Sequence, residues 1–109
     1  MITDESIEQA VEYLRTNSVR AAKARAERIY MEEYRKVVKA QIMRAHDDKA
    51  LGAQEAIAYA DPKYTEHLKV MQEAIEKDEY CRWMMVAAEA KIEAWRTQQS
   101  NQRALGKLG

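Results

Sequence analysis

The chain has 109 residues, the size of one small domain, and its 18 basic side chains balance 18 acidic ones. With 47% hydrophobic and 33% charged residues, one proline and three glycines, the composition excludes both a disordered chain and a turn-rich β-protein. The longest apolar run, residues 83–88, is far shorter than the ~20 residues that cross a bilayer.

The start of the chain, residues 1–5, is acidic and lacks the features of a signal peptide. A single cysteine, Cys81, excludes an intrachain disulfide. We therefore expect a cytoplasmic, all-α protein with no membrane segment, folded as a single helical domain over residues 1–109.

A short amphipathic helix is predicted at the N-terminus, after the acidic residues Asp4 and Glu5. Its apolar residues follow the spacing of one helix face: Ile7, Ala10, Val11 and Leu14. We expect this helix to end at residues 16–18 (Thr-Asn-Ser), whose side chains compete for backbone hydrogen bonds. The next apolar face, which begins at Val19, is also out of phase with Leu14.

Ser18 can cap a second, long helix that runs to about Arg44 or Lys49. Its apolar residues gather on one side: Val19, Ala26, Ile29, Tyr30, Tyr34, Val37 and Val38. Its basic residues lie opposite, within about 100° of one another, and Glu32 is the one acid in that arc. These basic residues are Arg25, Arg28, Arg35, Lys36 and Lys39, with Arg44 following near the helix end.

Residues 46–48 (His-Asp-Asp) predict a turn, and residues 49–60 favour a helix with Gly52 as its weak point. Asp61 and Pro62 form the firmest boundary, because Asp caps helices well and Pro suits the first helical position. From there one helix is predicted to about Gln102, followed by a loose tail over residues 103–109. Such a helix spans ~60 Å, too long for a monomer of this size to bury. We expect a helical hairpin or bundle that packs through homo-oligomerisation.

The last helix carries two apolar stripes. The first is Tyr64, Leu68, Met71 and Ile75, and the second is Cys81, Met85, Ala88, Ile92 and Trp95. The polar residues 76–79 between them predict a bend or a change of packing partner. Residues 83–88 are apolar all round, which predicts burial on every side. Core packing is the expected role of Trp83 and Trp95, with base stacking as the alternative.

The residues predicted to form the core or the subunit interface come from both long helices. They are Tyr30, Tyr34, Val37, Met71, Ile75, Trp83, Met85, Ile92 and Trp95.

The zero net charge is a sum of blocks along the chain. Residues 1–14 carry a net charge of −4, residues 15–49 +5, residues 50–81 −4 and residues 82–109 +3. The basic stripe within residues 15–49 is what binding to a phosphate backbone needs, because such affinity comes from several displaced counterions. The alternative is a solvated face whose charges form salt bridges, such as Glu32 with Arg28 or Lys36.

Signals for catalysis are weak. The sequence has no glycine-rich phosphate loop, no cysteine pair and no HExxH motif. His46 is adjacent in sequence to two aspartates, so the three side chains cannot converge on a metal from a regular helix, and His67 is expected on the surface. We expect no enzyme activity, no metal and no cofactor.

Two stretches resemble the UvsY-type recombination mediators of tailed phages. Residues 31–40 (Met-Glu-Glu-Tyr-Arg-Lys-Val-Val-Lys-Ala) resemble that family's Ile-Glu-x-x-Lys-Lys-Val helix, which continues with basic and alanine residues. Residues 92–97 (Ile-Glu-Ala-Trp-Arg-Thr) resemble the family's Leu-Asp-Ala-Ile-Lys-Ser, at a similar distance after Tyr80. Together, residues 31–40 and 80–97 cover about a quarter of the chain.

The resemblance implies a non-catalytic protein that loads a recombinase onto single-stranded DNA coated by single-strand binding protein, in phage recombination, repair and replication. It implies a ring-forming homo-oligomer, with Arg35 and Lys36 matching the family's basic pair before Val. Two further basic positions of the family fall on Ala40 and Ile42, so that part of the DNA site departs from the pattern. The alternative hypothesis is a helical protein-interaction module that does not bind nucleic acid.

Overall fold

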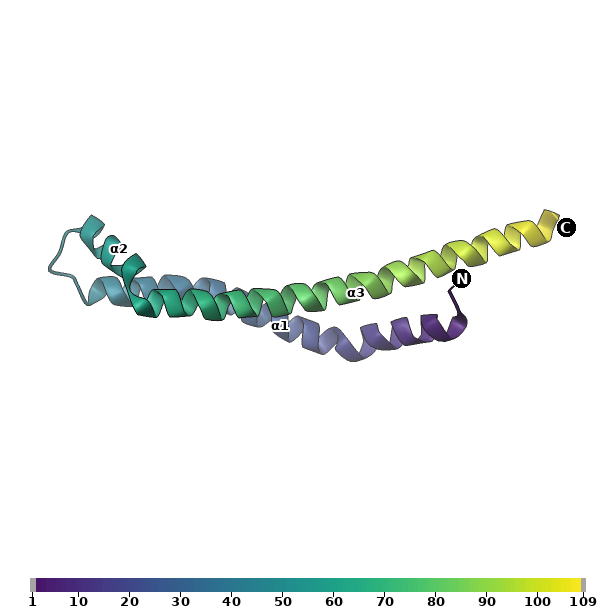
Figure 1. Cartoon of the computed structure of the whole chain (residues 1–109), viewed down its shortest axis with the longest axis horizontal. Coiled ribbons are helices and arrows are strands. Elements are labelled where there is room, and N and C mark those ends of the chain that lie inside the picture. The colour runs from purple at the N-terminus through teal and green to yellow at the C-terminus, as the bar shows by residue number, and fades with distance from the viewer. Residues whose placement is uncertain (1, 109) are drawn as a thin grey trace. The chain divides into compact units, whose positions relative to one another are not determined.

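The computed structural model describes residues 2–108, and all the regular secondary structure in that range is helical, which confirms the all-α class. The elements in order are α1 (Asp4–Arg44), α2 (Leu51–Ala60) and α3 (Pro62–Leu108) (Figure 1). Within residues 2–108, no helix has the length and apolar character needed to span a membrane.

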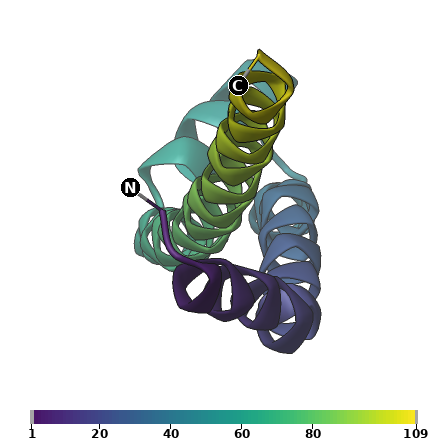
Figure 2. The ribbon, with the colours of Figure 1, turned by 90° about the vertical axis from the view of Figure 1, so that its right-hand side faces the viewer.

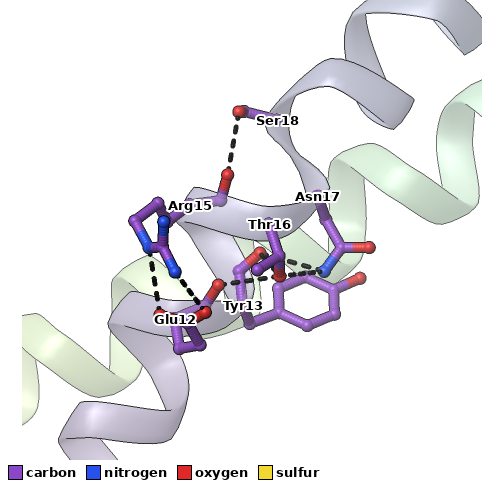
Figure 3. A network of polar contacts seen from close by, with 6 residues as sticks. All are labelled: Glu12, Tyr13, Arg15, Thr16, Asn17 and Ser18. Carbon is purple, nitrogen blue, oxygen red and sulfur yellow. Dashed lines mark hydrogen bonds and ion pairs between the residues drawn. The ribbon is translucent and has the colours of Figure 1, made fainter.

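α1 runs without a break through residues 16–18, so the predicted end of a short N-terminal helix is wrong. The side chains there bond back to helix carbonyls instead of ending the helix (Figure 3). The Thr16 hydroxyl donates to the Glu12 carbonyl at 2.8 Å, and the Asn17 amide donates to the Tyr13 carbonyl at 3.0 Å. This back-bonding satisfies polar side chains inside a helix, which is why they do not act as caps here.

The boundary at Asp61 and Pro62 is confirmed. The Asp61 carboxylate accepts a hydrogen bond from the Lys63 backbone N–H at 2.7 Å, and Pro62 is the first residue of α3. α3 then continues to Leu108, so the predicted end near Gln102 and the loose tail are wrong for residues 103–108, although their side chains are exposed.

The chain divides into two compact units. Unit 1 combines the chain up to Ala21 with the chain from Tyr80 onward, and unit 2 is Ala22–Glu79. The division after Glu79 falls at the end of the polar segment 76–79, where the sequence predicts a change of packing partner.

In unit 2, α1 and the first half of α3 lie side by side and antiparallel (Figure 1 and Figure 2). Arg28 of α1 reaches Asp78 of α3, and further along α1 the Met31 carbonyl lies 2.7 Å from the Nε2 atom of His67. The contact positions alternate in steps of three and four residues, the spacing of a heptad seam. The buried and half-buried ones include Ala24, Arg28, Met31, Val38 and Ile42 in α1, and Tyr64, His67, Met71, Ala74 and Asp78 in α3.

His67 is therefore buried, and its predicted surface position is wrong. Its ring also lies 5.6 Å from the Tyr34 ring, centroid to centroid.

Unit 1 repeats the same spacing on both helices. α1 contributes Ile7, Ala10, Leu14, Asn17 and Ala21, and α3 contributes Cys81, Met85, Ala88, Ile92 and Trp95. All five α3 residues are buried or half-buried, which confirms the second predicted stripe. The Trp95 indole N–H donates to the Asp4 carboxylate at 3.3 Å and so ties the two helices together.

Small side chains make up most of this core. Among the described residues the buried hydrophobic ones are Ile7, Ala10, Ala24, Ile42, Ala58, Ala74, Cys81 and Ala88, and no large side chain is fully buried. The predicted apolar face of α1 points largely to solvent: Tyr30 is 61% exposed, and Val19, Ile29 and Val37 are also exposed. Residues 83–88 are not buried on every side within the chain, because Trp83 is 58% exposed and only Ala88 is buried.

Two isoleucines of α1 give a matched test of where the seam lies. Ile42 is 6% exposed and Ile29 is 49% exposed. We expect Ile42→Ala to lower the free energy of unfolding by about 2–4 kcal/mol, because it leaves a cavity in the seam, and Ile29→Ala by less than about 1 kcal/mol. Urea denaturation at one low protein concentration measures both. Equal losses would contradict the seam.

Candidate nucleic-acid interface

All three helices of unit 2 contribute to one hollow. Arg35, Lys36 and Lys39 come from α1, Tyr59 comes from α2 and Tyr64 from α3, around a cavity of about 270 Å³. Three of the six basic residues predicted to bind DNA therefore lie together, beside two aromatic rings. This combination of cations and aromatic faces suits phosphate contacts and base stacking.

The hollow is built around the turn that joins α2 to α3. Tyr59 lies near the end of α2 and Tyr64 in the first turn of α3, so the turn at Asp61 and Pro62 brings the two rings together. The ring centroids are 5.4 Å apart and the ring planes meet at 82°, an edge-to-face contact.

Lys39 connects the basic helix to these rings. Its ammonium group donates a hydrogen bond to the Tyr59 hydroxyl at 2.8 Å, lies 4.7 Å from the centroid of the Tyr59 ring and is 3.7 Å from the Glu55 carboxylate. The hydrogen bond to Tyr59 raises the pKa of Lys39 above its ordinary value; desolvation opposes this shift, and the charge of Glu55 makes a smaller contribution that raises it. Lys39 is therefore a fixed positive charge on the wall of the hollow.

The other two cations are more accessible. Arg35 is exposed, and Lys36 forms an exposed pair with Glu33 at 3.2 Å, a contact that an incoming phosphate can replace at little cost. Arg25 and Arg44 are also exposed on α1, but they are not part of the lining of the hollow.

Arg28 has a different environment, on the seam between α1 and α3. Its guanidinium contacts Glu32 at 2.8 Å, Glu79 at 2.9 Å and Asp78 at 3.2 Å. Hydrogen bonds to Glu32, then to Glu79 and Asp78, raise the pKa of Arg28 further above its usual range. Three carboxylates more than neutralise one guanidinium, so this position is unsuited to holding a phosphate.

The residues predicted for the core or the subunit interface separate into two groups. Tyr34, Met71, Ile75, Met85, Ile92 and Trp95 are half-buried within the chain. Tyr30, Val37 and Trp83 are exposed, and the Arg82 guanidinium lies 5.1 Å from the centre of the Trp83 ring system.

Sequence reasoning did not identify Tyr59 and Tyr64 as functional. They belong to different helices, and only the turn and the packing of both helices against α1 bring them to Lys39. One sequence feature could have pointed to them. The two tyrosines flank the one proline of the chain, shortly after the basic helix.

Other chemistry is sparse. Within residues 2–108, no group of three or more His, Cys, Asp or Glu side chains is arranged to hold a metal ion. Cys81 is buried as a free thiol. Unit 1 has an apolar hollow of about 220 Å³, lined by Gln9, Ala10, Tyr13, Met84, Ala87, Ala88 and Lys91.

No family model, curated protein or solved structure matches this chain.

The ion-pair cluster at Arg28 is open to a direct test. We expect Arg28→Met to lower the melting temperature, because it removes the guanidinium that neutralises the half-buried Asp78 carboxylate. The double variant Arg28→Met/Asp78→Leu should recover much of that loss, since it removes both charges. Arg96→Met is the control, because the Arg96–Glu93 pair is exposed and should contribute little. Thermal unfolding followed by circular dichroism measures all three, and an equal effect of the Arg28 and Arg96 substitutions would contradict the assignment.

Proposed function

We propose that this protein binds single-stranded DNA without catalysis and acts as a recombination mediator. The observation that carries the proposal is the hollow that places Arg35, Lys36 and Lys39 beside Tyr59 and Tyr64. The cations contact the phosphate backbone and the tyrosine rings stack on bases. Both kinds of contact tolerate any base sequence.

The number of cations sets how strongly binding depends on salt. Each phosphate neutralised on a single strand contributes about −0.7 to the slope of log affinity against log salt concentration. Three cations per subunit therefore give a slope of about −2 for one site. Binding by one subunit is weak, and several subunits on one strand strengthen it through avidity.

The mediator role comes from the family resemblance of residues 31–40 and 80–97. In that role the protein loads a recombinase onto DNA coated by single-strand binding protein and exchanges one DNA-coating protein for another. It needs no cofactor and hydrolyses no nucleotide. The proposed setting is the host cytoplasm, in phage DNA recombination, repair and replication.

Homo-oligomerisation is part of the proposal and is supported by the exposed apolar surface. Large apolar side chains are exposed on the helices of each unit: Val19 and Trp83 in unit 1, and Ile29 and Tyr30 in unit 2. Paired helices assembled through these surfaces, as a hairpin bundle or ring, would also bring several hollows onto one strand.

A second candidate function is favoured by the same surface. Large apolar side chains such as Tyr30 and Trp83 are exposed on helices, as expected of a module that binds another protein through helix faces. In that case the basic hollow is incidental.

Binding of a fluorescent single-stranded oligonucleotide, measured by anisotropy at two salt concentrations, separates the two functions. We expect Arg35→Ala/Lys36→Ala/Lys39→Ala to weaken binding at low salt by at least about tenfold and to flatten the salt slope by about 2. Tyr59→Leu should weaken binding while leaving the salt slope nearly unchanged, because stacking carries no charge.

The matched control is Lys23→Ala/Lys69→Ala/Lys77→Ala, which removes three exposed cations of unit 2 that do not line the hollow. It should change affinity much less. Absence of binding at micromolar protein, or equal losses in the two triple variants, would argue for the interaction module.

A further inference from the structure

α3 carries a second heptad stripe whose residues are all exposed, although Ala87 at its middle also borders the apolar hollow of unit 1. Unit 1 buries the stripe that includes Cys81 and Ala88, whereas a second stripe along the same helix is exposed at every position. We call this the outer stripe: Tyr80, Trp83, Ala87, Ala90 and Ala94. The steps of three, four, three and four residues are those of a helix–helix contact.

The outer stripe contains no charged residue, and its two large side chains are unusually open for aromatics. Tyr80 and Trp83 are each 58% exposed, and the flanking Met84 and Val86 are 38% and 41% exposed. The centres of subunit contacts are poor in charged residues and rich in aromatic ones. An uncharged heptad stripe with this much exposed aromatic and aliphatic surface is therefore typical of a subunit contact.

The order of side-chain sizes along the stripe identifies the occupant. The large residues Tyr80 and Trp83 are at one end and the small residues Ala90 and Ala94 at the other, with Ala87 in the middle. If a second copy packs antiparallel about Ala87, each Trp83 meets Ala90 and each Tyr80 meets Ala94. Large side chains then face small ones, and the helices interdigitate without gaps.

A parallel arrangement lacks this fit. It sets Trp83 against Trp83 and Ala94 against Ala94, which forces the helices apart at one end and leaves a void at the other. The stripe is therefore complementary to itself in one direction only, the condition for a two-fold symmetric contact.

We propose that the outer stripe of α3 binds the same stripe of a second copy, antiparallel and centred on Ala87. This pairing would be one contact of the homo-oligomer in the proposed function, and it does not depend on DNA binding. The stripe belongs to unit 1 and the basic hollow to unit 2, so the two can fail separately.

Ala87→Arg tests the contact, because it places two arginines against each other at the two-fold axis. We expect it to raise the dissociation constant of the pair by at least about 100-fold, seen as a smaller species in sedimentation velocity. Helix content should be unchanged, since residue 87 is exposed and Arg is a good helix former. Ser100→Arg, with the same charge change at an exposed position off the stripe, should sediment like the wild type.

Cysteine cross-linking tests the direction without perturbing the contact. In the antiparallel pair the two residues at 87 face each other, whereas those at 94 lie about 21 Å apart along the axis, given a rise of about 1.5 Å per residue. Under mild oxidation Ala87→Cys should give a disulfide-linked dimer and Ala94→Cys should not. The wild type, with its buried Cys81, is the background control.

Two results of sedimentation would overturn the proposal. The first is a wild type that is monomeric at all concentrations, which would indicate that the stripe binds a different protein. The second is an Ala87→Arg variant that sediments like the wild type. Efficient cross-linking of Ala94→Cys would overturn the antiparallel register. The oligonucleotide anisotropy of Ala87→Arg is measured alongside. If Ala87→Arg no longer assembles but each subunit still binds DNA weakly, both proposals are supported. If the wild type assembles but does not bind DNA, only the proposed function is rejected.

Discussion

Small side chains on the seam between α1 and α3 determine how much of this chain can be buried. Ala10, Ala24, Ala74 and Ala88 are four of its buried positions. Alanine favours helix and lets two helices approach closely, but each buried alanine removes little apolar surface from water. The helices are therefore well formed while the core is thin. Larger apolar side chains such as Ile29, Tyr30 and Trp83 are left on the outside, where a second molecule can cover them.

A thin alanine seam specifies register poorly, because one alanine can replace another when two helices slide. The polar residues of the seam specify the register instead. Arg28 contacts Asp78, and the Met31 carbonyl lies within hydrogen-bond distance of His67, so a shift by one heptad would separate both pairs. Buried polar contacts of this kind add little net stability, since desolvation offsets much of the attraction, but they favour one alignment over others.

The Asp61–Pro62 boundary and the α3 stripe from Cys81 to Trp95 could be predicted from the sequence, whereas the α1 seam and the hollow could not. Asp61 and Pro62 act within one turn of helix, so that boundary was recognisable. The α1 seam was not, because Val19, Ile29 and Tyr30 are more hydrophobic than the alanines that are actually buried. The break expected at residues 16–18 failed because Thr16 and Asn17 satisfied their polar groups within the helix. The hollow required Tyr59 and Tyr64 to meet across a turn.

The seam also explains how a chain with no net charge can present a basic site. Arg28, from the basic block of residues 15–49, contacts Asp78 and Glu79 of the acidic block 50–81, so part of the charge balance is internal to unit 2. Arg35 and Lys36, about two turns further along α1, are exposed at the hollow instead. Net charge averages over these two environments, but a phosphate responds to the local field within about one Debye length, roughly 8 Å at physiological salt. Because Arg28 engages Asp78 and Glu79 of α3, the proposed DNA site relies on Arg35, Lys36 and Lys39 rather than on Arg28.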